Sequence, residues 1–138
     1  MPVEQDWLIP DHLASVRFFG DVTLHDVGVA FGRSAELVDA SGGKQVHFLH
    51  DWQDVTSYPT NVIQIRQALQ ARVSDRSKLG WVVIYGMDHQ LLRFLSHIAL
   101  ELFKVRVKQL ETRIDAITFL YHIDPALPEI PKAPKSPA

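Results

Sequence analysis

The 138-residue sequence contains no cysteine. A disulfide framework, a thiolate nucleophile and a zinc site with cysteine ligands are therefore excluded. No apolar run approaches the ~20 residues that a membrane-spanning helix needs. The amino terminus has neither the basic start nor the apolar stretch of a secretory signal. These absences make a cytoplasmic protein without a membrane span the expectation.

Sequence motifs of the common enzyme classes are missing as well. The chain has no Gly-x-Ser-x-Gly elbow, no Walker loop and no Gly-x-Gly-x-x-Gly turn. Its formal net charge of −2 also argues against a nucleic-acid partner, because phosphate binding depends on a basic surface. We therefore expect no catalysis, no cofactor and no nucleic-acid partner.

What the sequence does contain is a regular alternation of strand-like and helix-like segments. Apolar runs predict strands, and apolar residues at helical spacing predict helices. The predicted order is β-β-α-β-α-β-α-β-α, with strands at 7–9, 13–20, 44–49, 81–86 and 104–111 and with helices at 23–41, 60–72, 88–102 and 112–120. This order indicates a single α/β domain whose five-stranded sheet is mainly parallel, with one antiparallel strand from the N-terminal hairpin.

The proposed domain covers residues 1–124. From Pro125 onward the sequence is rich in proline and lacks periodicity, which predicts a flexible C-terminal tail at 125–138. Two helix starts carry a capping pattern, in which a threonine is followed three residues later by an aspartate: Thr23 with Asp26, and Thr112 with Asp115.

The last predicted strand has one basic face. Val105 and Val107 point one way, and Lys104, Arg106 and Lys108 point the other way. This pattern is typical of a sheet edge, where lysines discourage pairing with another chain. An alternative use of the same face is contact with an acidic partner or with phospholipid headgroups.

The stretch HDWQDVTSYPTN, residues 50–61, is predicted to connect the third strand to the second helix. It follows a buried strand, at the end where α/β proteins often place functional groups. Its acids, hydroxyls and amide fit a ligand site or a switch. The ordinary interpretation is a turn, in which Pro59 and Thr60 end the strand and begin the helix.

Three segments, together with the order of elements, resemble the STAS domain family: GDVTLHD, VHFLHDWQDVTSYPTN and FKVRVKQLETRIDAITFLYHID. This is the SpoIIAA-like fold of anti-sigma factor antagonists, and the chain looks more like the divergent bacterial STAS-like proteins of unknown function. The resemblance covers roughly residues 6–124. It implies a non-catalytic regulatory or scaffolding protein that acts by protein–protein interaction. The implied partners are a regulatory kinase, a phosphatase or a sigma-factor regulator.

In that family the loop after the third strand carries an Asp-Ser-Ser-Gly motif, whose serine is phosphorylated by a partner kinase. The resemblance places Pro59, Thr60 and Asn61 where the Asp and the two Ser would stand, and the Gly is missing. It therefore implies Thr60, with Ser57 as an alternative, as the site of phosphorylation. The implied switch and interaction surface consists of Asp51, Asp54, Ser57, Thr60, Asn61 and Gln64.

Seven histidines raise the question of a metal site. His47 and His50 face opposite sides of an extended strand, so only His50 and Asp51 could enter a site with Asp54. On the third predicted helix the polar residues recur every four positions opposite the apolar side, which is typical of a solvated face: His89, Arg93, His97 and Glu101. We expect no metal.

Two other functions remain open from the sequence. The chain is compatible with a small apolar ligand-binding or lipid-binding module, which the wider STAS group also resembles, and with an enzyme that has an unrecognised polar site. A homodimer is also compatible with the sequence, because the N-terminal hairpin would leave apolar sheet surface uncovered.

Overall fold

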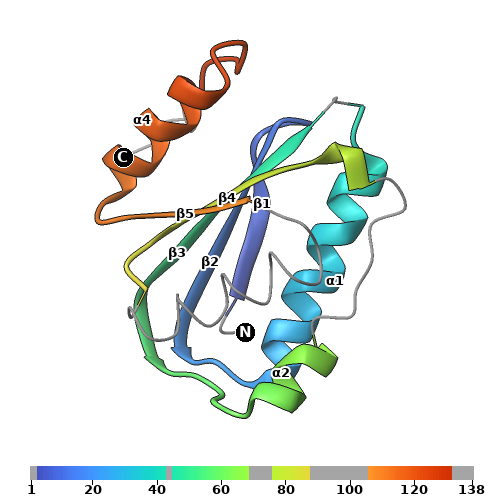
Figure 1. Ribbon diagram of the computed structural model, residues 1–138, viewed down its shortest axis with the longest axis vertical. Helices are drawn as coiled ribbons and strands as arrows, with labels where there is room; N and C mark the ends of the chain where they lie inside the picture. The colour runs from blue at the N-terminus through green and yellow to red at the C-terminus, as the bar shows by residue number, and fades with distance from the viewer. Residues whose placement is uncertain (1–2, 43–44, 69–75, 88–105, 132–138) are drawn as a thin grey trace, which may run out of the picture.

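The computed structural model describes residues 3–42, 45–68, 76–87 and 106–131 (Figure 1). The strands in these residues are β1 (Val3–Ile9), β2 (Leu13–Asp21), β3 (Val46–Ser57), β4 (Leu79–Tyr85) and β5 (Arg106–Leu110). The helices are α1 (Leu24–Ala40), α2 (Val62–Ala68) and α4 (Arg113–Ile123), with the short 3-10 helix η1 (Arg76–Lys78). The predicted third helix, 88–102, lies outside the described residues, as do Lys104 and Val105.

The five strands lie side by side in their sequence order, β1-β2-β3-β4-β5. β1 is antiparallel to β2, and the other neighbouring strands are parallel. The predicted α/β class, with a mainly parallel sheet and an antiparallel N-terminal hairpin, is therefore confirmed. β1 begins at Val3, which is earlier than the sequence predicted.

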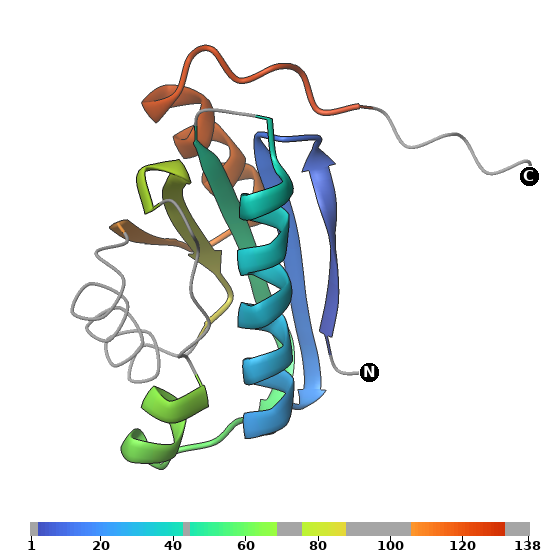
Figure 2. The same cartoon turned by 90° about the vertical axis from the view of Figure 1, so that its right-hand side faces the viewer.

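Helices cover both faces of the sheet, and each face has its own apolar core. Figure 2 shows α1 in front of the sheet and α4 behind it. We call the side covered by α1 and α2 the α1 face, and the opposite side the α4 face. The α1-face core includes Phe18, Phe48, Trp52 and Ile65, and the α4-face core includes Leu13, Leu49, Val83 and Leu120. Adjacent residues of β3 thus belong to different cores, because side chains alternate along a strand.

Helix α1 begins with the capping box that the sequence predicts. The Thr23 hydroxyl accepts from the Asp26 N–H at 3.2 Å, and the Asp26 carboxylate accepts from the Thr23 N–H at 2.8 Å. These bonds satisfy two backbone donors that a helix start would otherwise leave free. The helix ends at Ala40, one residue before the predicted end, because Ser41 caps it through bonds to the Val38 carbonyl.

Helix α4 begins at the other predicted cap, where the Thr112 hydroxyl accepts from the Asp115 N–H at 3.2 Å. Ala116 and Leu120 are buried against the sheet. Ile114, in contrast, is 76% exposed. Ile114 lies in the first turn of the helix, on the side turned away from the buried Ala116 and Leu120.

The segment after α4 returns to the domain. Leu127 is buried in the α4-face core, and Ile130 packs against the same core. The Tyr121 hydroxyl donates to the Pro128 carbonyl at 2.7 Å. The first residues of the predicted tail thus contact the domain, and the flexibility of the segment stays a prediction.

The largest difference from the sequence-based expectation is the length of β3. The sequence predicted a strand that stops at Leu49, but β3 runs through the following eight residues to Ser57 and stays paired with β2. Charged residues do not end the strand, because they alternate with buried His50 and Trp52 and occupy the exposed side. Register shifts opposite Arg17 to Phe19 and opposite Gly20 to Asp21 accommodate the added residues. Only residues 58–61 connect β3 to α2.

Candidate functional site

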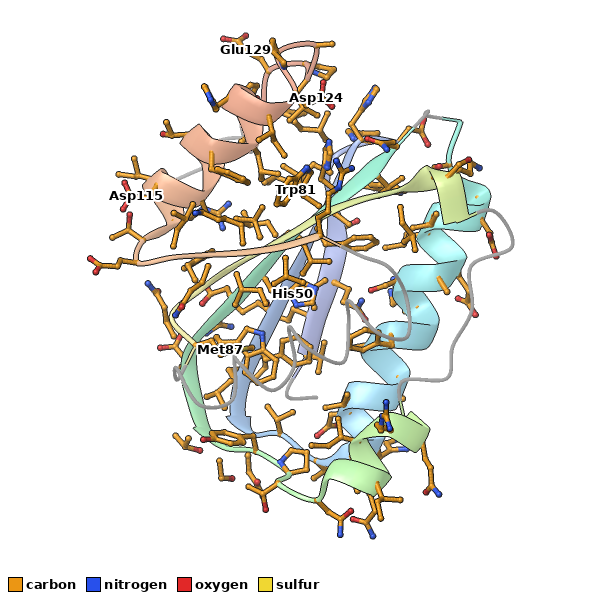
Figure 3. The ribbon with its side chains drawn as sticks, viewed as in Figure 1. His50, Trp81, Met87, Asp115, Asp124 and Glu129 are labelled. Atoms are coloured by element: carbon orange, nitrogen blue, oxygen red, sulfur yellow. The ribbon has the colours of Figure 1, made fainter. Side chains whose placement is uncertain are left out.

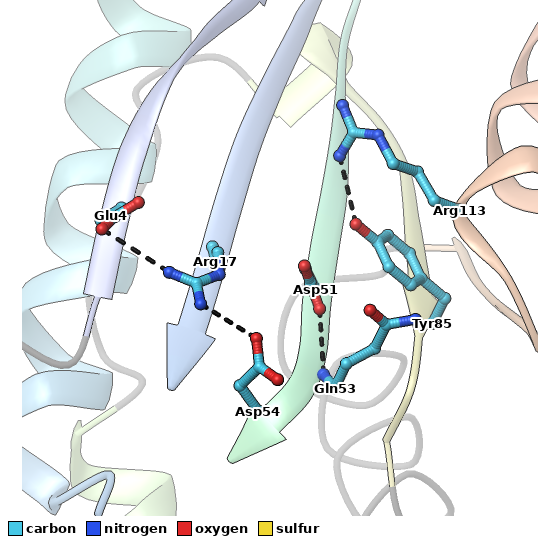
Figure 4. A network of polar contacts seen from close by, with 7 residues as sticks. All are labelled: Glu4, Arg17, Asp51, Gln53, Asp54, Tyr85 and Arg113. Carbon is cyan, nitrogen blue, oxygen red and sulfur yellow. Dashed lines mark hydrogen bonds and ion pairs between the residues drawn. The ribbon is translucent and has the colours of Figure 1, made fainter. Parts of the chain in front are cut away.

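The C-terminal half of β3 carries acidic residues on the α4 face of the sheet. Asp51 and Gln53 point to this face, because Trp52 between them is buried in the α1-face core. The Gln53 N–H donates to the Asp51 carboxylate at 2.9 Å. Figure 4 shows both residues, with Asp54, beside side chains from four other elements. This part of the predicted site is therefore a polar network on a sheet and not a loop.

Arg17 of β2 makes the ion pairs of the network. Its Nη2 donates to Asp54 Oδ2 at 2.9 Å, and its Nη1 lies 3.6 Å from Glu4 Oε1. The guanidinium carbon also lies 4.7 Å from the centre of the Phe19 ring. The hydrogen bond to Asp54, helped by the charge of Glu4, raises the pKa of Arg17 above its ordinary value. Because solvent reaches these pairs, they orient the side chains more than they stabilise the fold.

Tyr85, at the end of β4, connects the sheet to α4. Its hydroxyl accepts a hydrogen bond from Arg113 Nη1 at 3.1 Å, and its side chain is buried. Burial raises the pKa of the Tyr85 phenol above its ordinary value, and Asp51 raises it further, while Arg113 lowers it. The phenol is therefore protonated at neutral pH, where it serves as a hydrogen-bonding group and not as a base or nucleophile.

Ser57 lies at the end of β3 and is exposed, but its hydroxyl has a partner. The hydroxyl donates to the Asp21 carboxylate, and the Ser57 carbonyl accepts from the Val22 N–H at 2.9 Å. These bonds join the ends of β2 and β3 just before α1 begins. The Ser57 hydroxyl is therefore already engaged in holding these two strand ends together.

Thr60, Asn61 and Gln64 lie together at the start of α2, and all three are exposed. Asn61 caps the helix, because its side-chain Oδ1 accepts from the Gln64 N–H at 3.0 Å and its carbonyl accepts from the Ile65 N–H. The helix begins at Val62, later than the predicted Thr60, since Asn61 supplies the cap. Ile63 in the same turn is 69% exposed, although Ile65 is buried.

The structure divides the predicted surface into two parts. Asp51 and Asp54 belong to the network on the α4 face, and Thr60, Asn61 and Gln64 lie beyond the end of the strand. At roughly 3.3 Å per residue, Asp51 and Ser57 are about 20 Å apart along β3. Asp51 is therefore distant, along the strand, from the end of β3 that leads to Thr60.

Sequence reasoning missed the residues that complete the network: Glu4, Arg17, Tyr85 and Arg113. The signal for Arg17 was present, because a single charge stands inside the apolar strand LASVRFFG and needs a partner on the exposed face. The role of Tyr85 depends on its contact with α4, and no spacing in the sequence reveals that contact.

The two histidines of β3 face opposite sides, as predicted, but neither enters the network. His47 is on the α4 face, where Nε2 lies 3.0 Å from Asp124 Oδ2 and Nδ1 accepts from the Trp81 N–H at 2.9 Å. His50 is buried on the α1 face beside Phe18, at a ring-centre distance of 5.8 Å. His50 therefore does not enter a site with Asp51 and Asp54, because alternation along β3 turns its ring toward Phe18 and Phe48 (Figure 3).

Burial lowers the pKa of His50 to about 4, so its imidazole is neutral at physiological pH. Among the residues that the structure describes, no group of three histidine or carboxylate side chains is placed to hold a metal ion. In the same described parts of the chain, no helix is long and apolar enough to cross a membrane.

No protein-family model and no curated protein matches the chain. Two solved structures share its architecture. An uncharacterised protein of the DUF3478 family with a SpoIIAA-like fold, from Shewanella loihica PV-4, has a TM-score of 0.56 at 14% identity, over 86% of this chain and 91% of that protein. The anti-sigma factor antagonist SpoIIAA in its unphosphorylated form has a TM-score of 0.52 at 11% identity, over 86% of this chain and 96% of that protein. The chain therefore has the SpoIIAA-like fold that its sequence resembles.

Proposed function

We propose that the chain is a non-catalytic regulatory or scaffolding protein of the cytoplasm that acts by binding a protein partner. The proposed contact is the α2 patch, which we define as Thr60, Asn61, Ile63 and Gln64. The observation that carries the proposal is the 69% exposure of Ile63 in the midst of exposed polar side chains. A large apolar group ringed by polar groups is the composition of the centre of an interface.

Two contacts hold this patch in place. Ile65 packs into the α1-face core, and Asn61 caps the first turn of the helix. Tyr58 and Val55, just before the patch, also pack against that core. A surface that is ordered before binding loses less entropy when a partner docks, which favours affinity.

We propose that phosphorylation of Thr60 regulates the patch. Thr60 is exposed and directly precedes the residue that caps α2. A phosphate near a helix start gains from free backbone N–H groups and from the helix dipole. It would add nearly two negative charges beside Ile63, which is enough to change an apolar contact. Ser57 is the weaker candidate, because a phosphate there would face the Asp21 carboxylate that its hydroxyl now contacts.

The likeness in fold to an anti-sigma factor antagonist favours a regulatory kinase, a phosphatase or a sigma-factor regulator as the partner. Partner binding can be tested by substituting each of two exposed isoleucines, one inside the α2 patch and one outside it. Ile63 lies in the α2 patch, whereas Ile114, 76% exposed, lies on α4. We expect Ile63→Lys to abolish binding of a partner that wild type and Ile114→Lys retain in quantitative affinity purification from the source cells. Equal capture by all three proteins would contradict the α2 patch as the contact.

The switch needs a separate experiment. The chain is incubated with ATP and the native kinases, and the peptide that contains both hydroxyls is examined by mass spectrometry. We expect phosphate on Thr60, and we expect it to disappear in Thr60→Ala but not in Ser57→Ala. An unmodified peptide would remove the switch and leave the binding proposal standing.

A further inference from the structure

The two edge strands of the sheet carry charges of opposite sign. On β1, Gln5 Nε2 donates to the Ala30 carbonyl of α1 at 2.9 Å, so this side chain lies on the α1 face. Its neighbours Glu4 and Asp6 therefore lie on the α4 face, where both are exposed. Glu4 is held there by its pair with Arg17 (Figure 4).

On β5 the positive charges lie on the same face. Val107 packs against the α1-face core, so its neighbours Arg106 and Lys108 lie on the α4 face. Two ring contacts on that face confirm their direction. The Arg106 guanidinium carbon lies 5.0 Å from the centre of the Trp81 ring, and Lys108 Nζ lies 5.7 Å from the centre of the Phe119 ring. Both basic residues remain exposed.

We propose that copies of this chain associate head to tail, with β1 of one copy pairing with β5 of the next. β1 is antiparallel to β2, and β2 through β5 run in one direction. If the next copy continues the sheet in the same orientation, its β1 therefore meets β5 in the antiparallel sense. The same orientation also keeps the α4 faces on one side, so the acidic and basic side chains meet.

The spacing of the charges fixes a register. Glu4 and Asp6 are two residues apart, as are Arg106 and Lys108. In an antiparallel pair, Glu4 then lies opposite Lys108, and Asp6 lies opposite Arg106. Opposite charges that face each other across two strands stabilise the pair. The pairing extends from Val3 to Asp6 on one copy and from Arg106 to Gln109 on the other.

The same charges disfavour the other edge pairings. Two β1 strands would bring carboxylates together, and two β5 strands would bring cations together, so like-with-like contacts are repulsive. When β1 of one copy pairs with β5 of another, one β1 and one β5 remain free at the two ends of the assembly. Further copies can therefore bind at either end. The sequence suggested a dimer through an uncovered apolar surface at the hairpin. The α4 face of that hairpin carries Glu4, Asp6 and Arg17 beside the half-buried Leu8 and Phe19, and a dimer through this surface stays a prediction.

Charge-reversal variants test the proposal by sedimentation velocity over a wide range of protein concentration. We expect wild type to show a mass that rises with concentration and falls with added salt, because salt screens exposed charges. Glu4→Lys/Asp6→Lys has two basic edges, and Arg106→Glu/Lys108→Glu has two acidic edges. Each should be monomeric alone, and the equimolar mixture should associate. A monomeric wild type, or association that neither variant weakens, would overturn the proposal.

The absence of native cysteine allows a second test, which examines the register directly. In the proposed register, Glu4→Cys/Lys108→Cys places a thiol of one copy opposite a thiol of the next. We expect mild oxidation to give a ladder of disulfide-linked oligomers, and the mismatched Glu4→Cys/Arg106→Cys to give far less. Equal yields from the two variants would reject the register, and the absence of any ladder would reject the pairing. Circular dichroism checks that each variant is folded.

Discussion

The two faces of β3 each bury a histidine, and they accommodate it in different ways. On the α4 face, His47 has a partner for both ring nitrogens, Asp124 and the Trp81 N–H. Because Nδ1 accepts a hydrogen bond, Nε2 carries the proton and donates to Asp124. On the α1 face, His50 lies among aromatic rings and remains neutral because burial lowers its pKa to about 4.

The same kind of polar side chain, a histidine, is thus buried in two different ways. His47 is a connector, since its ring joins β3 to β4 and to the end of α4. His50 contributes mainly apolar surface, and the α1 face tolerates it only in the neutral state. His47 is therefore held by specific bonds, whereas His50 is held by packing and only in its neutral state.

The largest effect is expected at Gly80, which lies directly against His47 on the α4 face. A Cβ atom on this residue would lie 2.3 Å from His47 Nδ1 and 2.9 Å from the Val46 carbonyl oxygen. We expect Gly80→Ala to lower the free energy of unfolding by about 3 kcal/mol, because the ring and a backbone atom must both move. Urea unfolding followed by circular dichroism measures it. Gly32→Ala in α1, where a Cβ meets nothing within 4 Å, is the control and should not destabilise.

A pH effect of similar size is expected on the α1 face. The pKa of His50 falls from 6.5 to about 4 on folding, so the unfolded chain binds more protons between these values. Stability should therefore drop as pH falls from 6.5 to 4, by about 3 kcal/mol in total. His50→Phe should remove most of this dependence, and His122→Asn, at an exposed position, should keep it. An unchanged slope in His50→Phe would mean that burial does not hold the imidazole neutral.

The two histidines should also differ when the same substitution is made. His47→Leu leaves the Trp81 N–H and the Asp124 carboxylate without their partner, which we expect to cost about 2 kcal/mol at neutral pH. His50→Leu replaces a neutral ring in an apolar core and should cost less. Paired urea titrations at neutral pH measure the difference. Equal losses would show that the bonds of His47 add little to the α4 face.

The smallest effect on stability is expected for the N-terminal caps of α1 and α4, the helices that cover the two faces of the sheet. Asp26 is buried and accepts bonds from both the Thr23 N–H and the Thr23 hydroxyl, whereas Asp115 is exposed. We expect Thr23→Ala to cost about 1.5 kcal/mol and Thr112→Ala about 0.5 kcal/mol. Thermal unfolding of both variants tests the order. A larger loss for Thr112→Ala would mean that α4 depends more on its cap than α1 does.

The sequence predicts which helices and strands are present better than it predicts where they begin and end. Apolar periodicity and the threonine caps locate α1 and α4, because these signals are local. The end of β3 was misplaced, since Asp51 and Asp54 look like loop residues unless the partner Arg17 on β2 is known. Exposure of Ile114 and burial of Leu127 likewise depend on contacts between elements far apart in the chain. The sequence therefore identifies individual candidate residues. It does not predict that some of them belong to the polar network on the α4 face and others to the α2 patch.

The strand order has a consequence for synthesis. Among the strands that the structure describes, each pairs with the one made just before it, so none of them has to enter between two that are already paired. As the chain leaves the ribosome, the N-terminal hairpin can form first and the sheet can grow from one side, in the order of translation. Until β5 arrives, the growing side of the sheet is the unpaired edge of β4, which Arg106 to Leu110 then cover. The edge of β4 carries no charged residue, so the nascent sheet has an edge prone to aggregation until its basic border is in place.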